Sequence, residues 1–255
     1  MNPLTARRSR QAHPFKDRLY SNLGPCLRVA LVAGSRLLIL AALVLGVAAT
    51  AALLVFREID PPGSTVMALQ RLEGIEIDQR WVPLHAISPN LIRAVIMSED
   101  NQFCRHFGVD IAELRRAIRR AERDDDDVRG ASTISMQTTK NLLLWPDKSY
   151  MRKAIEIPLT LVMEQIWPKR RIMEVYLNIA EWGPGIFGAE AAARYHFGKP
   201  ASALSRREAA LLAVALPNPL TRVASRPSPS LRRVAALIER RVRVMGTRAA
   251  CVLNE

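Results

Sequence analysis

The sequence predicts a mostly α-helical domain behind one N-terminal transmembrane helix. An uncharged apolar run covers residues 37–56, and beyond it apolar residues recur at helical spacing rather than in strict alternation. The chain of 255 residues is long enough for one sizeable core. Its apolar fraction of 49% excludes a disordered chain, and its 12 glycines and 16 prolines exclude a collagen-like or low-complexity protein.

The apolar run at 37–56 predicts the transmembrane helix. At a rise of about 1.5 Å per residue, this run spans about 30 Å, the thickness of a bilayer core. A buried soluble helix rarely has so long an uncharged stretch, and the apolar region of a cleaved signal peptide is usually shorter. The expected plan is a basic tail over 1–36, the transmembrane helix, a Pro/Gly-marked linker over 57–74 and a domain over 75–255.

The charge distribution predicts both an orientation and an anionic partner. Residues 1–36 carry seven basic side chains and one acidic one, so the positive-inside rule keeps the N-terminus in the cytoplasm. Of the net charge of +13, the tail accounts for +6, which leaves +7 on residues 57–255. A basic domain outside the cytoplasm favours anionic lipid or a phosphate-bearing substrate over nucleic acid.

The cysteines and histidines limit the metal and redox chemistry. The three cysteines Cys26, Cys104 and Cys251 are widely spaced, and the chain has only four histidines. Without a CxxC or Cys/His cluster, the sequence argues against zinc and excludes a disulfide framework. It assigns no role to Cys104.

Capping signals mark where helices of the domain begin. Ser88 before Pro89 is typical of an N-cap followed by proline at the first helical position, and that helix leads to Glu99. Two capping-box pairs predict further starts, Asp110 with Glu113 and Ser205 with Glu208. Periodicity predicts helices at 132–144, 150–166, 169–180, 188–196, 206–216 and 231–245.

Two patches near the first of these helices carry residues suited to chemistry. Glu99 and Asp100 are adjacent carboxylates, and repulsion with burial would raise the pKa of Glu99 toward that of a useful general base. The residues alone favour the other interpretation, a pair of surface acids at a helix end with a structural histidine. Thr133, Gln137 and Lys140 share one helical face near a helix start, which could hold an anion. Here the alternative is an N-cap with an exposed polar face.

Two more patches follow along the chain. Arg152 and Glu156 are four residues apart on one helical face, and the alternative to a functional pair is a surface ion pair. Pro158 should kink their helix, because it cannot donate a hydrogen bond to the carbonyl of Ala154. After the next helix, the glycines of 183–188 are typical of a turn, or of backbone that meets a ligand closely.

Taken in order, these patches resemble the glycosyltransferase family 51 domain of bacterial peptidoglycan polymerases. The likeness covers about residues 75–225, in blocks at 99–110, 130–141, 152–156, 171–178 and 204–213. It implies a lysozyme-like, mostly α fold. The implied reaction polymerises lipid II into β-1,4-linked glycan strands, with release of undecaprenyl diphosphate, in cell-wall biosynthesis. The short chain leaves no room for a transpeptidase domain, as expected for a monofunctional member.

The resemblance also implies roles for single residues. Glu99 matches the general base on the acceptor hydroxyl, and Glu156 matches a catalytic glutamate near the donor diphosphate. Substrate-binding positions implied in the same cleft are Asp100, Phe103, His106, Ser132, Thr133, Gln137, Lys140, Arg152, Lys153, Tyr176 and Asn178. The family usually has two glutamines where this chain has Met136 and Gln137. Since Gln137 matches the more important of the two, activity is expected to survive.

The implied surroundings follow from the same likeness. A divalent cation, Mg²⁺ or Mn²⁺, often assists the family's reaction, and no organic cofactor is expected. The expected partners are lipid II, the nascent glycan chain, inner-membrane lipids and division or cell-wall synthesis proteins, but no nucleic acid. The expected location is the bacterial inner membrane, with one span, a cytoplasmic N-terminus and a periplasmic catalytic domain.

Two other functions account for part of this pattern. A lytic glycan-cleaving enzyme of lysozyme-like fold also needs carboxylates, but it has no diphosphate at the scissile bond for a basic cluster to stabilise. A non-catalytic cationic protein that tethers envelope polymers or recruits division proteins would require none of Glu99, Gln137 and Glu156. A membrane-anchored diphosphate donor, by contrast, calls for an anchored enzyme with Lys and Arg at the leaving group.

Overall fold

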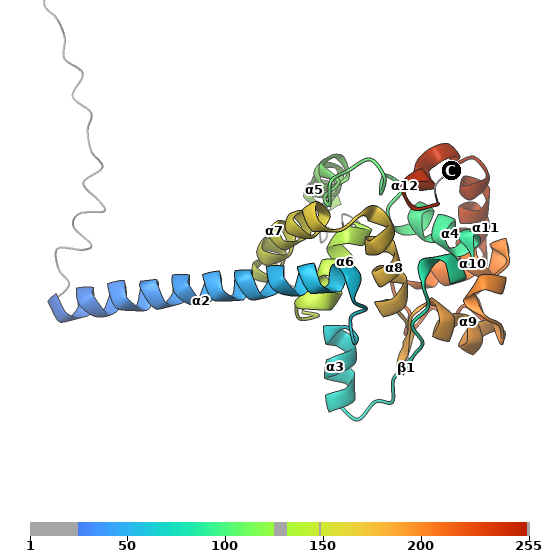
Figure 1. Cartoon of the computed structure of the whole chain (residues 1–255). Helices are drawn as coiled ribbons and strands as arrows, with labels where there is room; N and C mark the ends of the chain where they lie inside the picture. The colour runs from blue at the N-terminus through green and yellow to red at the C-terminus, as the bar shows by residue number, and fades with distance from the viewer. Residues whose placement is uncertain (1–24, 125–131, 148, 254–255) are drawn as a thin grey trace, which may run out of the picture. The chain divides into compact units, whose positions relative to one another are not determined.

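A computed structural model describes residues 25–124, 132–147 and 149–253, in two compact units that divide between Ala48 and Ala49. The first unit contains the N-terminal part of α2 (Pro25–Glu58), which is the predicted apolar helix extended at both ends (Figure 1). Its segment Val29–Glu58 has a mean hydropathy of 2.8, and 6% of its most apolar window is buried. By length and composition, α2 is a candidate membrane anchor.

The second unit is mostly helical, as predicted. After α2 its α-helices are α3 (Thr65–Leu72), α4 (Pro89–Glu99), α5 (Ile111–Asp124), α6 (Ile134–Leu143), α7 (Tyr150–Ile166), α8 (Lys169–Ile179), α9 (Ala189–Phe197), α10 (Arg206–Ala215), α11 (Pro229–Arg243) and α12 (Ala250–Leu253). Short 3-10 helices lie at η1 (Leu84–Ala86), η2 (Ala201–Ala203) and η3 (Gly246–Ala249). Helix α3 lies in the stretch 57–74 that was predicted to be a linker. Ser64 caps α3 and Met67 anchors it in the core.

The predicted helix starts are confirmed by side-chain caps. Ser88 accepts a hydrogen bond from the backbone N–H of Asn90, and Asp110 accepts one from the backbone N–H of Glu113. Ser205 and Glu208 form the expected reciprocal capping box. Helix α7 includes Pro158 within one continuous helix, and the kink predicted there stays a prediction.

A small sheet, which the sequence analysis did not predict, lies beside the helices. It contains β1 (Asp78–Gln79), β2 (Glu181–Gly183) and β3 (Ile186–Phe187) in the order β1-β3-β2, with β1 parallel and β2 antiparallel to β3. Gly185 turns between β2 and β3 with a φ of +70°, and a Cβ there would lie 2.3 Å from the carbonyl oxygen of Glu76. Gly185 therefore forms a turn that packs against neighbouring backbone. Of the two interpretations offered for the glycines of 183–188, a turn or a close approach to a ligand, the turn is the one observed here.

The helices of the second unit include two groups that pack closely within themselves. Helices α4, α10 and α11 pack against one another, while α6 packs against both α7 and α8 (Figure 1). Alanines on α9 and α10 are buried, and their small side chains let neighbouring elements pack closely against these helices. The largest fully buried side chains are Trp182, Tyr176, Phe103 and Phe187. This packing brings the C-terminal end of α4 next to the N-terminal end of α6, where Ile134 N–H donates to Asp100.

The structure corrects the interpretation of the cysteines. Cys104, to which no role was assigned, forms a disulfide with Cys251 across a sequence separation of 147 residues. The bond links the segment after α4 to α12. Arg170 of α8 also donates to the carbonyl of Val252, so the C-terminal segment is held by α8 as well as by the disulfide.

We expect loss of this disulfide to lower the stability of the domain. Cross-linking residues this far apart in sequence restricts the unfolded chain, and removal of such a bond typically costs about 2–5 kcal/mol. Cys251→Ser should therefore unfold at a lower urea concentration than the parent protein in detergent, as should the parent protein after reduction. Cys26→Ser is the control and should keep the parent midpoint. Equal midpoints for Cys251→Ser and the parent would contradict a stabilising role.

Candidate active site

The carboxylate of Glu99 is the centre of the candidate site. Glu99 is the last residue of α4, and its Oε2 accepts a hydrogen bond from Nε2 of Gln137 at 3.1 Å. The hydroxyl of Tyr176 donates to Oε1 of Gln137 at 3.3 Å, so the amide group of Gln137 is oriented with its NH₂ toward Glu99. Three helices, α4, α6 and α8, thus meet at one carboxylate.

The surroundings of Glu99 raise its pKa above the ordinary value of 4.5. Burial is the largest cause, because it disfavours the charged form, and the neighbouring charge of Asp100 acts in the same direction. Hydrogen bonds from Gln137 and Ser98 and the charge of Arg222 oppose the rise without cancelling it. Burial also raises the pKa of Tyr176 well above its ordinary value, so its hydroxyl stays protonated and can donate. A carboxylate of raised pKa is a stronger base, as general-base catalysis requires.

Asp100 is buried and hydrogen-bonded, which rules out the interpretation of Glu99 and Asp100 as two surface acids. Its two carboxylate oxygens each lie 2.9 Å from Nε2 of His106, and Oδ2 accepts from the backbone N–H of Ile134 at 3.0 Å. The side chains of Asp100 and His106 are only 3% and 8% exposed. Asp100 therefore fixes the start of α6 against the end of α4, and it positions Glu99 and Gln137 relative to each other.

Three further predicted substrate-binding residues support the fold around the site. Thr133 caps α6 through the backbone N–H of Met136, and its hydroxyl donates to the carbonyl of Gly108. Phe103 and Asn178 are both 0% exposed. Lys169 Nζ lies 4.5 Å from the ring centroid of Phe103, and the amide of Asn178 bonds the backbone of Val82. Phe103 and Asn178 therefore support the fold here, and their expected contact with substrate stays a prediction.

A cationic cluster on α6 and α7 forms the second part of the site. Arg152 and Lys153 donate to the two different carboxylate oxygens of Glu156, and Nζ of Lys153 also lies 3.0 Å from the hydroxyl of Ser132. The Glu156 side chain is 2% exposed and that of Arg152 is 10% exposed, so this is not the surface ion pair of the alternative reading. Met136, where the family usually has glutamine, is buried.

Lys140 adds a third cation to this cluster. Burial lowers its pKa, the charges of Arg152 and Lys153 lower it further, and the charge of Glu156 opposes them. Within the cluster, Glu156 supplies one negative charge against the three positive charges of Lys140, Arg152 and Lys153. The surplus of positive charge fits an anionic group of substrate.

The Glu156 carboxylate is not arranged to bind a divalent cation. Both oxygens of Glu156 already accept from cationic side chains. Within the described ranges, no group of three or more His, Cys, Asp or Glu side chains could hold a metal ion. We derive no catalytic step from a bound cation.

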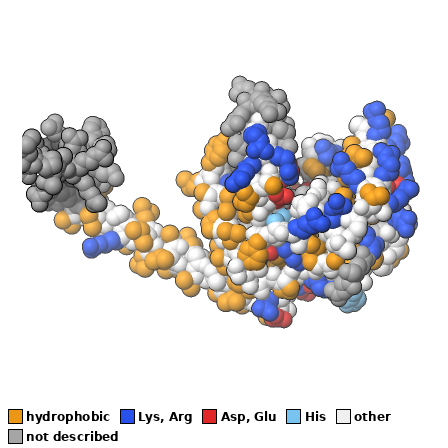
Figure 2. Space-filling view, turned by 90° about the horizontal axis from the view of Figure 1, so that it is seen from above, with side chains coloured by type: hydrophobic (Ala, Val, Ile, Leu, Met, Phe, Trp, Pro, Cys, Tyr) orange, Lys and Arg blue, Asp and Glu red, His pale blue; other side chains and the backbone are white. Residues whose placement is uncertain are grey.

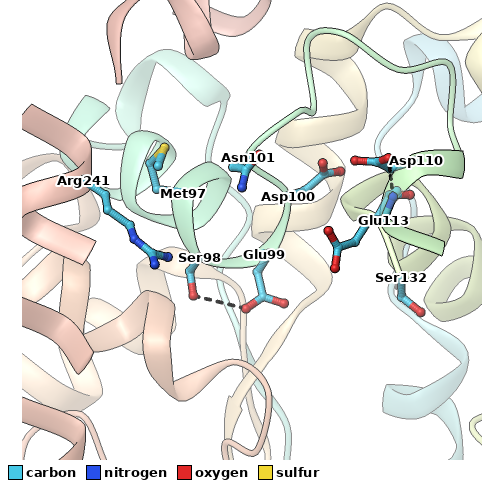
Figure 3. Close-up of a pocket in the computed structure, with 10 residues that line it drawn as sticks. Met97, Ser98, Glu99, Asp100, Asn101, Asp110, Glu113, Ser132 and Arg241 are labelled. Atoms are coloured by element: carbon cyan, nitrogen blue, oxygen red, sulfur yellow. Dashed lines mark hydrogen bonds between the residues drawn. The ribbon is translucent and has the colours of Figure 1, made fainter. Parts of the chain in front are cut away.

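Two cavities flank the bond between Glu99 and Gln137. The first, of about 210 Å³, is lined by Glu99 with Met97, Ser98, Asp100, Asn101, Asp110, Glu113, Ser132, Thr133 and Arg241 (Figure 3). The second, of about 250 Å³, is lined by Gln137 with Lys140, Tyr176, Glu181 and neighbouring apolar residues. Groups bound in the two cavities would therefore lie at the two partners of this hydrogen bond, Glu99 and Gln137. Sequence reasoning missed Arg241 because no motif distinguishes it.

The chain is similar to known proteins over most of its length. Residues 66–246 match the sequence profile of a family described as Transglycosylase. The chain is 53% identical over 193 residues to a biosynthetic peptidoglycan transglycosylase of Agrobacterium fabrum, covering 76% of this chain and 85% of that relative. A protein of the same name from Rhodospirillum centenum is 53% identical, with 78% and 87% covered, and one from Haemophilus influenzae is 47% identical, with 77% and 83% covered.

Proposed function

The chain belongs to the transglycosylase family of peptidoglycan glycosyltransferases, and from this premise we propose that Glu99 is the general base of glycan polymerisation. The substrates are lipid II and the growing glycan chain. The acceptor hydroxyl attacks the anomeric carbon of the donor, the bond to the diphosphate breaks, and the hydroxyl proton passes to Glu99. The observation that supports this role is a carboxylate of raised pKa on the wall of a cavity, oriented by Gln137.

The cationic cluster is proposed to stabilise the leaving diphosphate. Charge develops on the diphosphate oxygens as the bond between the donor sugar and the diphosphate breaks. Lys140 lies in the last turn of α6, and Arg152 and Lys153 lie in α7. Glu156 would act on this group indirectly, because it holds Arg152 and Lys153 in place. An enzyme that cleaves finished glycan has no diphosphate to stabilise, so the cluster supports polymerisation over lysis.

The direct test is incubation of the detergent-solubilised protein with labelled lipid II. We propose that it forms long glycan strands and releases undecaprenyl diphosphate. Finished glycan strands offered as sole substrate should remain intact. Shortening of those strands without polymer from lipid II would support the lytic alternative instead.

The enzyme is proposed to lie on the periplasmic side of the inner membrane. The seven basic side chains and single acidic one before residue 37 favour a cytoplasmic tail. The Cys104–Cys251 disulfide adds an independent argument, because such bonds persist in oxidising compartments such as the periplasm and are rare in the cytosol. Helix α2 would place the site close to lipid-linked substrates.

A reporter fusion tests this orientation. Alkaline phosphatase, which needs export for activity, should be active when fused after Glu255, and a fluorescent protein that matures only in the cytoplasm should be dark there. The same two reporters fused after residue 24, ahead of α2, should give the opposite pattern and serve as the control. Cytoplasmic fluorescence from the fusion after Glu255 would overturn the proposed orientation.

A further inference from the structure

Helix α11 presents an exposed row of side chains that the proposed mechanism does not use. Val234, Leu237 and Arg241 are spaced i, i+3 and i+7, which places them on one side of the helix. Val234 is 48% exposed and Leu237 is 36% exposed. The buried side of α11 is formed instead by Leu231, Ala235 and Ile238. The row therefore combines an aliphatic surface with a guanidinium group.

Arg241 stands at the cavity of the proposed base. It lines the same cavity as Glu99, and Figure 3 shows its side chain extending from α11 toward Ser98. In the part of the chain that the structure describes, its guanidinium has neither a hydrogen bond nor an ion pair. A guanidinium so placed is suited to a planar anion, since its N–H groups can donate two parallel hydrogen bonds to a carboxylate.

The protein supplies little negative charge near Arg241 from its own side of the cavity. Residues 199–250 contain eleven Lys and Arg and only two acids, Glu208 and Glu239. Glu208 pairs with Lys199, and Glu239 faces Arg207 at 3.8 Å. Figure 2 shows Lys and Arg side chains gathered over the side of the domain where α11 runs. Both carboxylates of α10 and α11 thus lie next to other cations, and neither forms an ion pair with Arg241.

The acidic residues that line the cavity limit which anion can bind at Arg241. Among the described residues that line it, Arg241 is the one cation, whereas Glu99, Asp100, Asp110 and Glu113 carry carboxylates. These acids repel a diphosphate more strongly than a single carboxylate, because a diphosphate carries more negative charge, and the diphosphate is better matched by the Lys140 cluster. A single carboxylate on an otherwise neutral, partly apolar group fits one guanidinium beside Val234 and Leu237.

We propose that Arg241, together with Leu237 and Val234, binds a carboxylate-bearing peptide of the incoming acceptor and so selects peptide-substituted lipid II. This inference rests on one part of the proposed function, namely that the acceptor hydroxyl binds next to Glu99. The acceptor sugar then lies in the Glu99 cavity, and the peptide carried by its neighbouring sugar extends toward α11. Arg241 is a specificity-determining residue in this scheme and takes no part in bond formation.

The test is the initial rate of glycosyl transfer between a separate donor and acceptor, because the product keeps the acceptor's diphosphate and can donate again. The donor is a lipid-linked glycan whose non-reducing end is blocked, so that it can only donate. The acceptors are lipid II with free peptide carboxylates and lipid II with those carboxylates amidated. For the free-carboxylate acceptor, Arg241→Gln should raise KM about tenfold with little change in kcat, and Arg241→Lys should recover part of the loss. For the amidated acceptor, Arg241→Gln and the parent enzyme should have equal KM.

The matched control is Arg233→Gln. Arg233 is exposed on the same helix but does not line the Glu99 cavity, so this variant should behave as the parent enzyme. An unchanged KM in Arg241→Gln would overturn the proposal, as would equal losses in both arginine variants, which indicate a general effect of surface charge. A loss of equal size with both acceptors would also overturn it, because Arg241 would then act on Glu99. Should Glu99→Gln prove active, the base assignment fails while the comparison of acceptors, made with Glu99 intact, still decides the role of Arg241.

Discussion

Glu99→Gln should lower the rate of polymerisation at saturating lipid II by about 10²–10⁴-fold, the usual loss on removal of a general base. Glutamine keeps the size of the side chain and can still accept a hydrogen bond from Gln137, so the site should keep its shape. It cannot take the proton from the acceptor hydroxyl. Lipid II affinity should persist, because Glu99 meets the acceptor hydroxyl and the diphosphate is bound by the cationic cluster. Rate and affinity measured on the same preparation check both parts.

The pH dependence of the parent enzyme adds a readout that a structural role would not move. The active form of a base is deprotonated, so the rate should fall as pH drops through the pKa of Glu99. Because burial raises that pKa, the fall should occur at higher pH than for an ordinary glutamate. Gln137→Ala removes a hydrogen bond that lowers the pKa, so it should move the fall to still higher pH. Near-normal turnover of Glu99→Gln would show that another group is the base.

Local signals in the sequence predicted most of the helices because each helix is defined by its own residues. The range 150–166 is reproduced, since Ser149 caps a helix whose apolar positions recur through Ile166. Helix α3 was missed because one buried residue, Met67, gives no periodic pattern. The strands are two or three residues long, too short for alternation to be recognised.

The site depended on contacts between distant residues, and the sequence predicted it only through the resemblance. Glu99 and Gln137 are 38 residues apart, and physics applied to the sequence alone favoured surface acids. The burial that raises the pKa of Glu99 arises from packing of α4 against α10 and α6 against α8. Cys104 and Cys251 are still farther apart, and Arg241 reaches the cavity only because α11 packs against α4. Local patterns cannot report such placements.

Lys140→Ala and Glu156→Gln should separate the cations of the site from the carboxylate that holds them. Lys140→Ala removes one stabiliser of the leaving diphosphate, and one such group is typically worth about 10²–10³-fold in kcat. Its fold should survive, because Lys140 is only half-buried on α6. Lys199→Ala, at a lysine that pairs with Glu208 of α10 and lines neither cavity, is the matched control and should retain parent turnover.

Glu156→Gln should slow polymerisation for a different reason and should bind the product more tightly. The substitution leaves Arg152 and Lys153 without the carboxylate that orients them, so the transition state loses well-placed donors. It also removes the charge that offsets theirs, which favours a bound anion. Inhibition by added undecaprenyl diphosphate should therefore strengthen in Glu156→Gln and weaken in Lys140→Ala. Because an uncompensated buried Arg152 can cost about 3–5 kcal/mol, the melting temperature of each variant must be compared first. Equal inhibition profiles in folded variants would mean that Glu156 does not act through the cations, and the division between binding and orienting groups would have to be abandoned.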